Sequence, residues 1–567
     1  MGLVAVGFQE MLKAAQRLFF GPLSNEIDFS TTLLQKPWVA LIPALGGLIV
    51  GLYFRFVVRR RAGHGVSEVI LALETRQGRL AWLSGVHTAI VSSITIGSGG
   101  SAGPEGPIIS IGAALASGLG QALSLPPNRL RTLLAAGAAA GLAGMYHAPL
   151  TGAAFSAEVL LEDLDPRTFS LLALAAVAAS AVAEQFHVAA PVTVPALPPA
   201  PWQSVPISAL LGLIAAPIGV ALLLFVNGLH ERTQRITLPD PLKPMLGGLV
   251  VGIIGLLLPR VLGSGEAGID QALHDEIAAG LLFTLPLAKL AATSITLGSG
   301  ATGGVFTPSL FIGATLGGAF GVAARTIWNG SGPEAAFALV GMGTVVAAAV
   351  NAPLTAILLV CEFTHDFTLL PQITTAVAAA VALARWLHPE SIYTLPLTFE
   401  GIDRHLFRRS PLVRVHVRDV MDVSWPVVAP DDPLATARAS GISALPVVTA
   451  DGRLVGMIDE RAMHAAAHDD ATPAGKAALP PRAIARPDES LHDLALRLGR
   501  SSTIPAVVPV IDERGHYLGT IEPGAILRVY SAADWPDERL RRRITHISGM
   551  PRETLARLHA RSRSKET

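Results

Sequence analysis

The chain has 567 residues, of which 51% are hydrophobic and 15% are charged, and its formal net charge at pH 7 is zero. Soluble globular proteins carry about 25% charged residues, so this composition disfavours a soluble protein, and the zero net charge gives no indication of a nucleic-acid partner. Charges are sparse over residues 80–390 and dense after residue 400. The distribution predicts a membrane domain over 1–408, followed by a soluble region.

The first twenty residues, MGLVAVGFQEMLKAAQRLFF, predict an amphipathic helix at the inner membrane surface and lack the features of a secretory signal. Apolar stretches then recur through the membrane domain: Trp38–Val57, Leu83–Ile96, Leu133–Met145, Phe169–Ala183, Ile207–Val226, Met245–Leu258, Ala335–Val350 and Ile373–Ala384. Several are shorter than the roughly 20 residues that a straight span needs. Broken or tilted helices along a pathway are typical of such a pattern. The only cysteine, Cys361, lies in an apolar run, so no intrachain disulfide is possible.

Two glycine-rich segments carry the strongest signal, and they align with each other without a gap. They are GSGGSAGPEGPIISIGAALAS (Gly97–Ser117) and GSGATGGVFTPSLFIGATLGG (Gly298–Gly318). Flanking matches keep the same order: GHGVSEVILAL (Gly63–Leu73) with GSGEAGIDQAL (Gly263–Leu273), and HAPLTGAAFSAEVL (His147–Leu160) with NAPLTAILLVCEF (Asn351–Phe363). We therefore expect an internal duplication with halves at about 36–190 and 205–395, joined by the Pro-rich segment Pro191–Gln203. The sequence alone leaves parallel and inverted halves open.

Each glycine segment is a polar loop that runs into an apolar helix, with Pro107 or Pro308 predicted at the first helical position. Such a loop exposes backbone N–H groups and the positive end of a helix dipole, and glycines let a small anion approach closely. Neither segment contains Lys or Arg, either of which would hold an ion too tightly for rapid passage. A nucleotide loop is disfavoured because Gly-Lys-Ser/Thr is absent, and close helix packing explains part of the glycine content.

Glu105 is the one carboxylate in this stretch, and its counterpart in the second half is Phe306. Repeat packing therefore does not require an acid here, and an ionisable group at membrane depth is functional by default. A carboxylate at a helix N-terminus can occupy an anion site and block it, and protonation would release it. We predict that Glu105 is a gate and proton acceptor; the alternative is a loop residue at the water interface.

At these residues the chain resembles the CLC chloride channel and transporter family. The matching motifs are GPEGP (Gly103–Pro107), GVFTP (Gly304–Pro308), GHGVS (Gly63–Ser67) and SIYTLPL (Ser391–Leu397). The resemblance implies an all-α polytopic membrane fold with inverted repeats and a homodimer with one pathway per subunit. It implies that Glu105 is the gate and that the anion contacts are His64, Gly65, Gly106, Val305, Phe306 and Tyr393, with no metal and no cofactor.

Three departures from the family pattern affect the expected mechanism. His64 replaces a serine at the inner anion contact, with Ser67 in place of the motif's proline, and Pro104 replaces a basic residue beside the gate. Val159 stands where family exchangers commonly carry an internal proton-transferring acid, next to Glu158. Because Glu158 matches Glu362 in the second half, we expect both to be structural.

The sequence is therefore interpreted as a chloride channel gated by a protonatable glutamate. A chloride/proton antiporter is the first alternative, and a membrane-anchored sensor without transport is the second. Voltage dependence cannot be read from these residues. Basic residues after the first apolar stretch, among them Arg55, favour a cytoplasmic loop there, and we expect a multi-pass protein of the plasma (inner) membrane.

The C-terminal region contains two copies of a strand–turn–strand pattern, Ile442–Asp459 and Ser502–Glu522. They resemble paired CBS domains, predicted at 412–470 and 473–531 with an α+β fold in the cytoplasm, followed by a basic tail at 532–567. The position at which a CBS domain commonly offers an Asp to ribose holds Ala462 and Ala525. Nucleotide binding is therefore disfavoured, and a dimer-stabilising role is the alternative.

Overall fold

The protein is described from a computed structural model that divides into two compact units, Met1–Gly401 and Ile402–Thr567. The described residues are 1–21, 37–58, 65–186, 192–195, 197, 201–328, 332–399, 412, 415–465, 469–499 and 504–532. The predicted anion contact His64 and nearly all of the predicted basic tail lie outside them.

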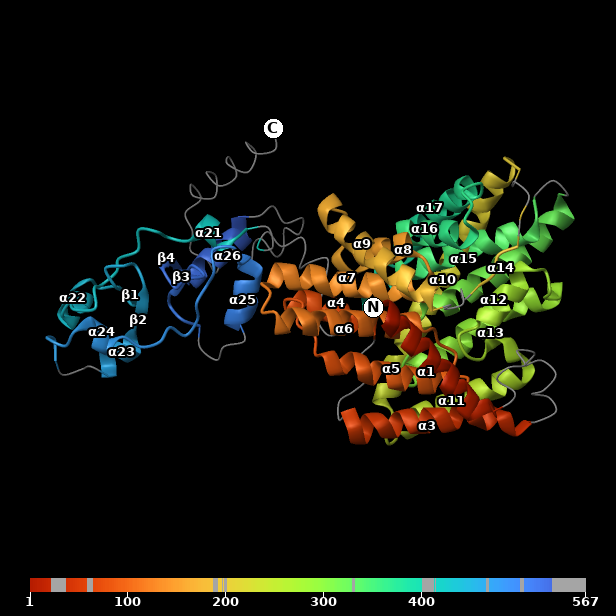
Figure 1. The fold of residues 1–567 in the computed structure, drawn as a ribbon, viewed down its shortest axis with the longest axis horizontal. Helices are drawn as coiled ribbons and strands as arrows, with labels where there is room; N and C mark the ends of the chain where they lie inside the picture. The colour runs from red at the N-terminus through yellow and green to blue at the C-terminus, as the bar shows by residue number, and fades with distance from the viewer. Residues whose placement is uncertain are drawn as a thin grey trace. The chain divides into compact units, whose positions relative to one another are not determined.

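The first unit is helical throughout its described part (Figure 1). The first half contains α1 (Gly2–Phe20), η2 (Pro37–Leu41), α3 (Ile42–Tyr53), η3 (Phe54–Val58), α4 (Val66–Thr75), α5 (Trp82–Gly97), α6 (Glu105–Ala122), α7 (Pro127–Tyr146), α8 (Pro149–Phe155), η4 (Ser156–Leu161) and α9 (Pro166–Gln185). The second contains α10 (Ser204–Arg235), α11 (Leu242–Leu257), η5 (Pro259–Val261), α12 (Glu266–Leu273), α13 (Ala279–Gly298), α14 (Phe306–Ile327), α15 (Glu334–Val350), α16 (Pro353–Thr364), α17 (Leu370–Leu387) and α18 (Leu395–Phe399).

Helices of very different length make up this unit. Within the described residues, six are long and apolar enough to cross a membrane: Pro37–Val58, Pro166–Gln185, Ser204–Arg235, Ala279–Gly298, Phe306–Ile327 and Leu370–Leu387. Apolar helices too short for a straight span lie between them, among them α11, α15 and α16. The mixture confirms the expectation of broken helices, which a membrane protein tolerates where the helix ends are buried in protein or line a cavity.

The two halves repeat the same packing. The helix pair α6 and α7 corresponds to α14 and α15, and α3 lies beside α11 where the halves meet (Figure 1). In both pairs glycine meets glycine: a Cβ built on Gly112 would lie 2.2 Å from the carbonyl oxygen of Gly137, and one on Gly313 would lie 2.3 Å from that of Gly341. Small residues therefore let the backbones approach closely, as expected for helix packing in membranes.

Helix α1 belongs to this repeat. It packs against α5, α7 and α9, whereas α10 packs against the equivalent helices α13, α15 and α17. Its buried residues include Ala5 and Phe8. The predicted amphipathic helix is thus confirmed, but its apolar side packs on protein instead of being left for a lipid surface.

The helices after the glycine loops begin two residues earlier than predicted. Because α6 begins at Glu105 and α14 at Phe306, Pro107 and Pro308 take the third helical position, and the prediction of the first position was wrong. The first four N–H groups of a helix have no partner within it, so proline costs no hydrogen bond at the third position either. The first turn of α14 still offers a backbone N–H group outside its own helix, because that of Thr307 donates to Glu105.

The second unit contains two similar hairpins with short helices: α21 (Val417–Val420), α22 (Leu434–Ala439), β1 (Leu445–Val448), β2 (Leu454–Ile458), α23 (Glu460–Ala465), α24 (Ala474–Ala477), α25 (Leu491–Gly499), β3 (Val508–Ile511), β4 (Tyr517–Ile521) and α26 (Pro523–Ala532). Both hairpins are antiparallel and share one register, with Pro446 opposite Met457 and Pro509 opposite Thr520, and both have an irregularity one residue before the first strand ends. Each has its own buried core, so the expected duplication is present in the structure.

Candidate functional site

Glu105 is completely buried at the N-terminus of α6, where its carboxylate meets two other helices. Oε1 accepts a hydrogen bond from the backbone N–H of Thr307 at 3.0 Å, at the start of α14. It also accepts one from the hydroxyl of Tyr146, the last residue of α7. That hydroxyl and Thr307 Oγ1 are 2.7 Å apart. The side chain of Glu105 thus occupies a cradle of donors that suits any small anion.

The two glycine loops are joined directly beside this carboxylate. Gly103 N–H donates to Gly304 O at 2.7 Å, and Gly304 N–H donates to Gly103 O at 2.6 Å, in an antiparallel bridge. A Cβ built on Gly103 would lie 2.1 Å from Glu105 Oε2, and one on Gly304 would lie 2.7 Å from it. At Gly304 the Cβ would also lie 2.7 Å from the backbone nitrogen of Gly106, so only glycine fits there unless the backbone shifts, whereas at Gly103 the Glu105 side chain alone would have to move. Among the described residues, Oε2 has no hydrogen-bond partner.

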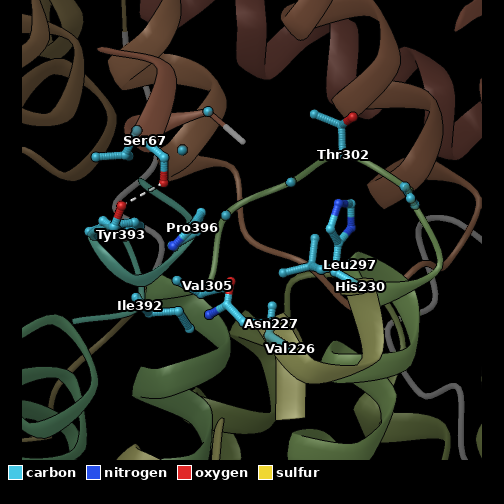
Figure 2. Close-up of a pocket in the computed structure, with 17 residues that line it drawn as sticks. Ser67, Val226, Asn227, His230, Leu297, Thr302, Val305, Ile392, Tyr393 and Pro396 are labelled. Carbon is cyan, nitrogen blue, oxygen red and sulfur yellow. Dashed lines mark hydrogen bonds between the residues drawn. The ribbon is translucent and has the colours of Figure 1, made fainter. Parts of the chain in front are cut away.

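Gly304 of this bridge also lines a pocket of about 60 Å³ (Figure 2). Four of the predicted anion contacts line it: Gly65, Gly106, Val305 and Tyr393. The hydroxyls of Tyr393 and Thr302, which also line it, are buried and have no hydrogen-bond partner in the described part of the chain. A buried donor without a partner is costly, so both hydroxyls are suited to an anion that enters here.

Phe306 differs from the other predicted contacts because it does not line this pocket. Its ring packs against those of Tyr146 and Phe155, with both centroid distances 6.3 Å. The donor that holds the gate is the N–H of the next residue, Thr307. The backbone donor predicted at Phe306 stays a prediction for an anion that has displaced Glu105.

Ser67, which replaces the family's proline, has a visible structural role. Its hydroxyl donates to the backbone oxygen of Tyr393 at 2.8 Å (Figure 2). The first half of the repeat thereby holds the segment that carries the predicted anion-binding hydroxyl. We call this end of the pathway the Tyr393 end.

Charged side chains mark the other side of Glu105. Lys289 of α13 is completely buried, and its Nζ donates to the backbone oxygens of Val261 and Gly263, each at 2.9 Å. The half-buried Glu266, at the start of α12, interacts electrostatically with both Lys289 and Glu105. The loop before α12 is the repeat counterpart of the loop before α4, which lines the Tyr393 end. The family resemblance implies inverted halves, which would place the two loops on opposite sides of Glu105.

Glu158 and Glu362 make equivalent bonds in the two halves, which agrees with the structural role predicted for them. The carboxylate of Glu158 accepts the backbone N–H groups of Leu354 and Thr355, at 3.0 and 2.9 Å, at the start of α16. Glu362 makes the equivalent bonds to Leu150 and Thr151, at the start of α8, each at 2.8 Å. Val159, where family exchangers carry an acid, is buried beside Glu158.

Sequence reasoning missed several residues of the site. Thr302 and Thr307 were available as the polar members of the second glycine segment, and Tyr146 directly precedes the duplicated HAPL motif. Asn227 and His230 line the pocket from α10, where no motif marked them. Only the fold brings that helix to the glycine loops.

The model of the family described as voltage gated chloride channel matches residues 46–385. The chain belongs to the CLC family. A CBS domain model matches residues 417–468. Among curated relatives, the voltage-gated ClC-type chloride channel ClcB of Escherichia coli O9:H4 (strain HS) is 33% identical over 402 residues, which cover 68% of this chain and 93% of the relative.

Solved structures of CLC proteins share the fold. A slow cyanobacterial Cl⁻/H⁺ antiporter is 23% identical, with a TM-score of 0.63 over 71% of this chain and 96% of its own. A eukaryotic CLC transporter is 19% identical, with a TM-score of 0.61 over 92% of this chain and 95% of its own. A CLC-type fluoride/proton antiporter is 23% identical, with a TM-score of 0.57 over 70% of this chain and 96% of its own. The protein is thus an integral, multi-pass membrane protein of the CLC type with a C-terminal CBS region.

The CBS region holds a separate cavity of about 230 Å³ between its two repeats. Asp459, directly after β2, lines it together with Arg461, and the two side chains form an ion pair at 2.6 Å. Ala462 and Ala525 are buried in the cores of their repeats and do not line it. A missing nucleotide contact at those two positions remains a prediction.

Proposed function

We propose that this CLC protein exchanges chloride for protons across the membrane, with Glu105 as the group that binds both in turn. The observation that carries the proposal is the position of the carboxylate in the donor cradle formed by Thr307 and Tyr146. An anion that needs those donors must displace the carboxylate. Because two anions repel strongly in surroundings of low dielectric constant, displacement is favoured when Glu105 takes up a proton.

This competition couples the two ions. A proton bound to Glu105 removes the charge that blocks the pathway, and a chloride that leaves lets the carboxylate return and lose its proton. Burial of Glu105 supports the proposal, since the side chain is 0% exposed and must move to exchange its proton with water. Two of the structural neighbours are themselves antiporters, one of chloride and protons and one of fluoride and protons, which supports the proposal.

A passive chloride channel is the second candidate. It is favoured by Val159, which removes the acid that commonly carries protons from inside in family exchangers, and by the channel name of the Escherichia coli relative. In a channel the gate would open and chloride would pass without a fixed number of protons moving in exchange. Antiport is preferred because the buried carboxylate occupies the donor cradle itself.

Flux measurements in proteoliposomes separate the two candidates. An outward chloride gradient, with no proton gradient at the start, should drive protons into the vesicles through the wild type, and Glu105→Gln should move chloride without protons and without dependence on pH. Chloride flux in the wild type without proton uptake would establish the channel instead. Absence of chloride flux would leave only the membrane-anchored sensor.

We further propose a homodimer with one pathway per subunit in the plasma membrane, with the CBS pair in the cytoplasm and no cofactor or enzymatic activity. The family resemblance supports the dimer, and the basic residues after the first span support the orientation. The mass of the detergent-solubilised protein and protease access to the CBS pair in inside-out vesicles test these points.

A further inference from the structure

The pocket at the Tyr393 end contains a titratable side chain that the proposed exchange has not yet used. His230 lies near the end of α10, and Figure 2 shows its imidazole pointing across the pocket toward Thr302. Of the 17 lining residues, it is the one whose side chain changes charge near neutral pH in ordinary surroundings. The pocket, at about 60 Å³, has room for a few water molecules at about 10–15 Å³ each.

The same pocket reaches the gate through glycine backbone alone. Gly106, which follows Glu105 in the chain, and Gly304 both line it. A Cβ on Gly304 would lie 2.7 Å from Glu105 Oε2. Glu105 Oε2, which has no hydrogen-bond partner among the described residues, therefore lies next to Gly304. Residue 304 has no side chain that could separate this oxygen from the pocket.

We infer that His230 passes protons between the water at the Tyr393 end and Glu105, in place of the acid that Val159 replaces. The inference rests on the proposed exchange, since a passive channel needs no such group. In the transfer the carboxylate turns toward the pocket, an N–H bond of the imidazolium breaks, a pocket water takes that proton while giving one of its own to the carboxylate, and an O–H bond forms on Glu105. The neutral imidazole then takes a proton from water on its own side.

The surroundings of His230 contain few charges. Helix α13 presents Leu297 to the pocket and Gly298 to Leu229, and its one charged residue, Lys289, is bonded to the backbone before α12. The other helices packed against α10 each carry one charged residue: Arg325 on α14, Glu334 on α15 and Arg385 on α17. Helix α10 itself carries Glu231, Arg232 and Arg235. None of them lines the pocket.

Two other roles for His230 make different predictions. If the imidazole only packs against the loop, its removal lowers chloride and proton movement in proportion. If it only attracts chloride by its positive charge, removal weakens apparent chloride affinity and leaves the number of protons moved per chloride unchanged. A proton-transfer role alone changes that ratio.

The test measures chloride and proton movement together in proteoliposomes of the full-length protein. His230→Gln should keep chloride movement and lower proton movement by about tenfold or more. The control is His274→Gln, at an exposed histidine directly after α12 whose ring bonds to the backbone oxygen of Asp270, and it should match the wild type. His230→Asn gives a second reading if the glutamine variant folds poorly. His230→Asp, which restores a titratable group, should regain proton movement at lower pH.

The outcomes are distinguishable. An unchanged ratio of protons to chloride in His230→Gln and His230→Asn, with a coupled wild type, overturns the role of His230 and leaves the exchange standing. A wild type that moves chloride without protons overturns both.

Discussion

Glu158 and Glu362 occupy equivalent positions in the two halves, and each carboxylate caps a short helix of the opposite half. Oε2 of Glu158 also accepts the hydroxyl of Thr355 at 2.7 Å, and Oε2 of Glu362 accepts that of Thr151 at 2.6 Å. A negative charge at a helix N-terminus stabilises the helix through its free N–H groups and its dipole. The pair therefore joins the two halves twice, through the same chemistry.

Replacing either acid by Gln should destabilise the membrane unit without changing ion coupling. Hydrogen bonds to a charged group contribute about 1.5–3 kcal/mol each, and an amide has one acceptor where the carboxylate has two. We expect Glu158→Gln and Glu362→Gln to lower the unfolding temperature in detergent by similar amounts. Loss of proton movement in Glu158→Gln alone would instead make Glu158 a proton site.

Tyr146→Phe should make the gate open more readily. The variant removes the hydroxyl that donates to Glu105 Oε1 and keeps the ring that packs on Phe306 and Phe363. Loss of a bond to a charged group worth about 1.5–3 kcal/mol destabilises the closed position of the carboxylate, so chloride flux at neutral pH should rise several-fold or more. Tyr53→Phe, which removes a hydroxyl bonded to His87 instead, is the control and should leave the flux unchanged.

Gly112→Ala should disrupt the packing of α6 on α7. The added Cβ would meet the carbonyl oxygen of Gly137 at 2.2 Å, so one helix has to shift. Overpacking of this kind typically costs about 1–3 kcal/mol. Gly7→Ala on α1 has open space for its Cβ and should be neutral or stabilising by up to about 1 kcal/mol. Equal unfolding temperatures of the two variants would contradict the packing described for this helix pair.

Lys289→Met should destabilise the end of the pathway opposite Tyr393. The substitution removes the donor to the carbonyls of Val261 and Gly263 and the cation that lies 5.2 Å from the centre of the Phe311 ring. Unsatisfied buried groups cost about 1–3 kcal/mol each. Lys13→Met removes an exposed ion pair with Glu10 and should change the unfolding temperature little. A stable Lys289→Met variant would show that the lysine is not needed to hold this loop.

Asp512→Asn should weaken the second CBS hairpin in a pH-dependent way. The hydrogen bond from the His516 ring, followed by those from the backbone N–H groups of His516 and Arg514, lowers the pKa of Asp512 to about 2. Because the pKa is lowered on folding, the carboxylate stabilises the hairpin above its ordinary pKa of about 3.9, and this contribution is lost as the pH falls toward 2. Hydrogen exchange of the β3–β4 amides should therefore be faster in the variant at pH 7, and the difference from the wild type should disappear only below about pH 2.

Most of the fold could be predicted from the sequence because the motifs of its two halves still align. Aligned positions singled out Glu105, which the structure places at the second glycine loop, and they matched Glu158 with Glu362, whose carboxylates make equivalent bonds. The gating role of Glu105 stays a prediction. Proline placement failed by two residues because helix ends depend on loop geometry, which local sequence specifies weakly. The packing of α1 on other helices was not predicted, because an amphipathic pattern indicates that one side of a helix is buried but not whether protein or lipid covers that side.

The missed site residues share one physical cause. Tyr146 and Thr307 stand in or beside the motifs, but their bonds to Glu105 form only after helices distant in the chain have packed together. His230 lies outside every motif, so no spacing within one segment could reveal it. The effect of Ser67 on Tyr393 is similar, because a hydroxyl that bonds to a backbone oxygen far along the chain leaves no local pattern.

The reciprocal bonds between Gly103 and Gly304 limit how the pathway can open. Separating the two loops would break two backbone hydrogen bonds, each worth about 4–6 kcal/mol in apolar surroundings if nothing replaces it. Rotating the Glu105 side chain between staggered positions keeps both backbone bonds and breaks only its own bonds to Thr307 and Tyr146, whose donors an incoming anion can take over. The low-energy motion is therefore a turn of the Glu105 side chain against a fixed backbone frame, and the two halves need not rock apart for an ion to cross.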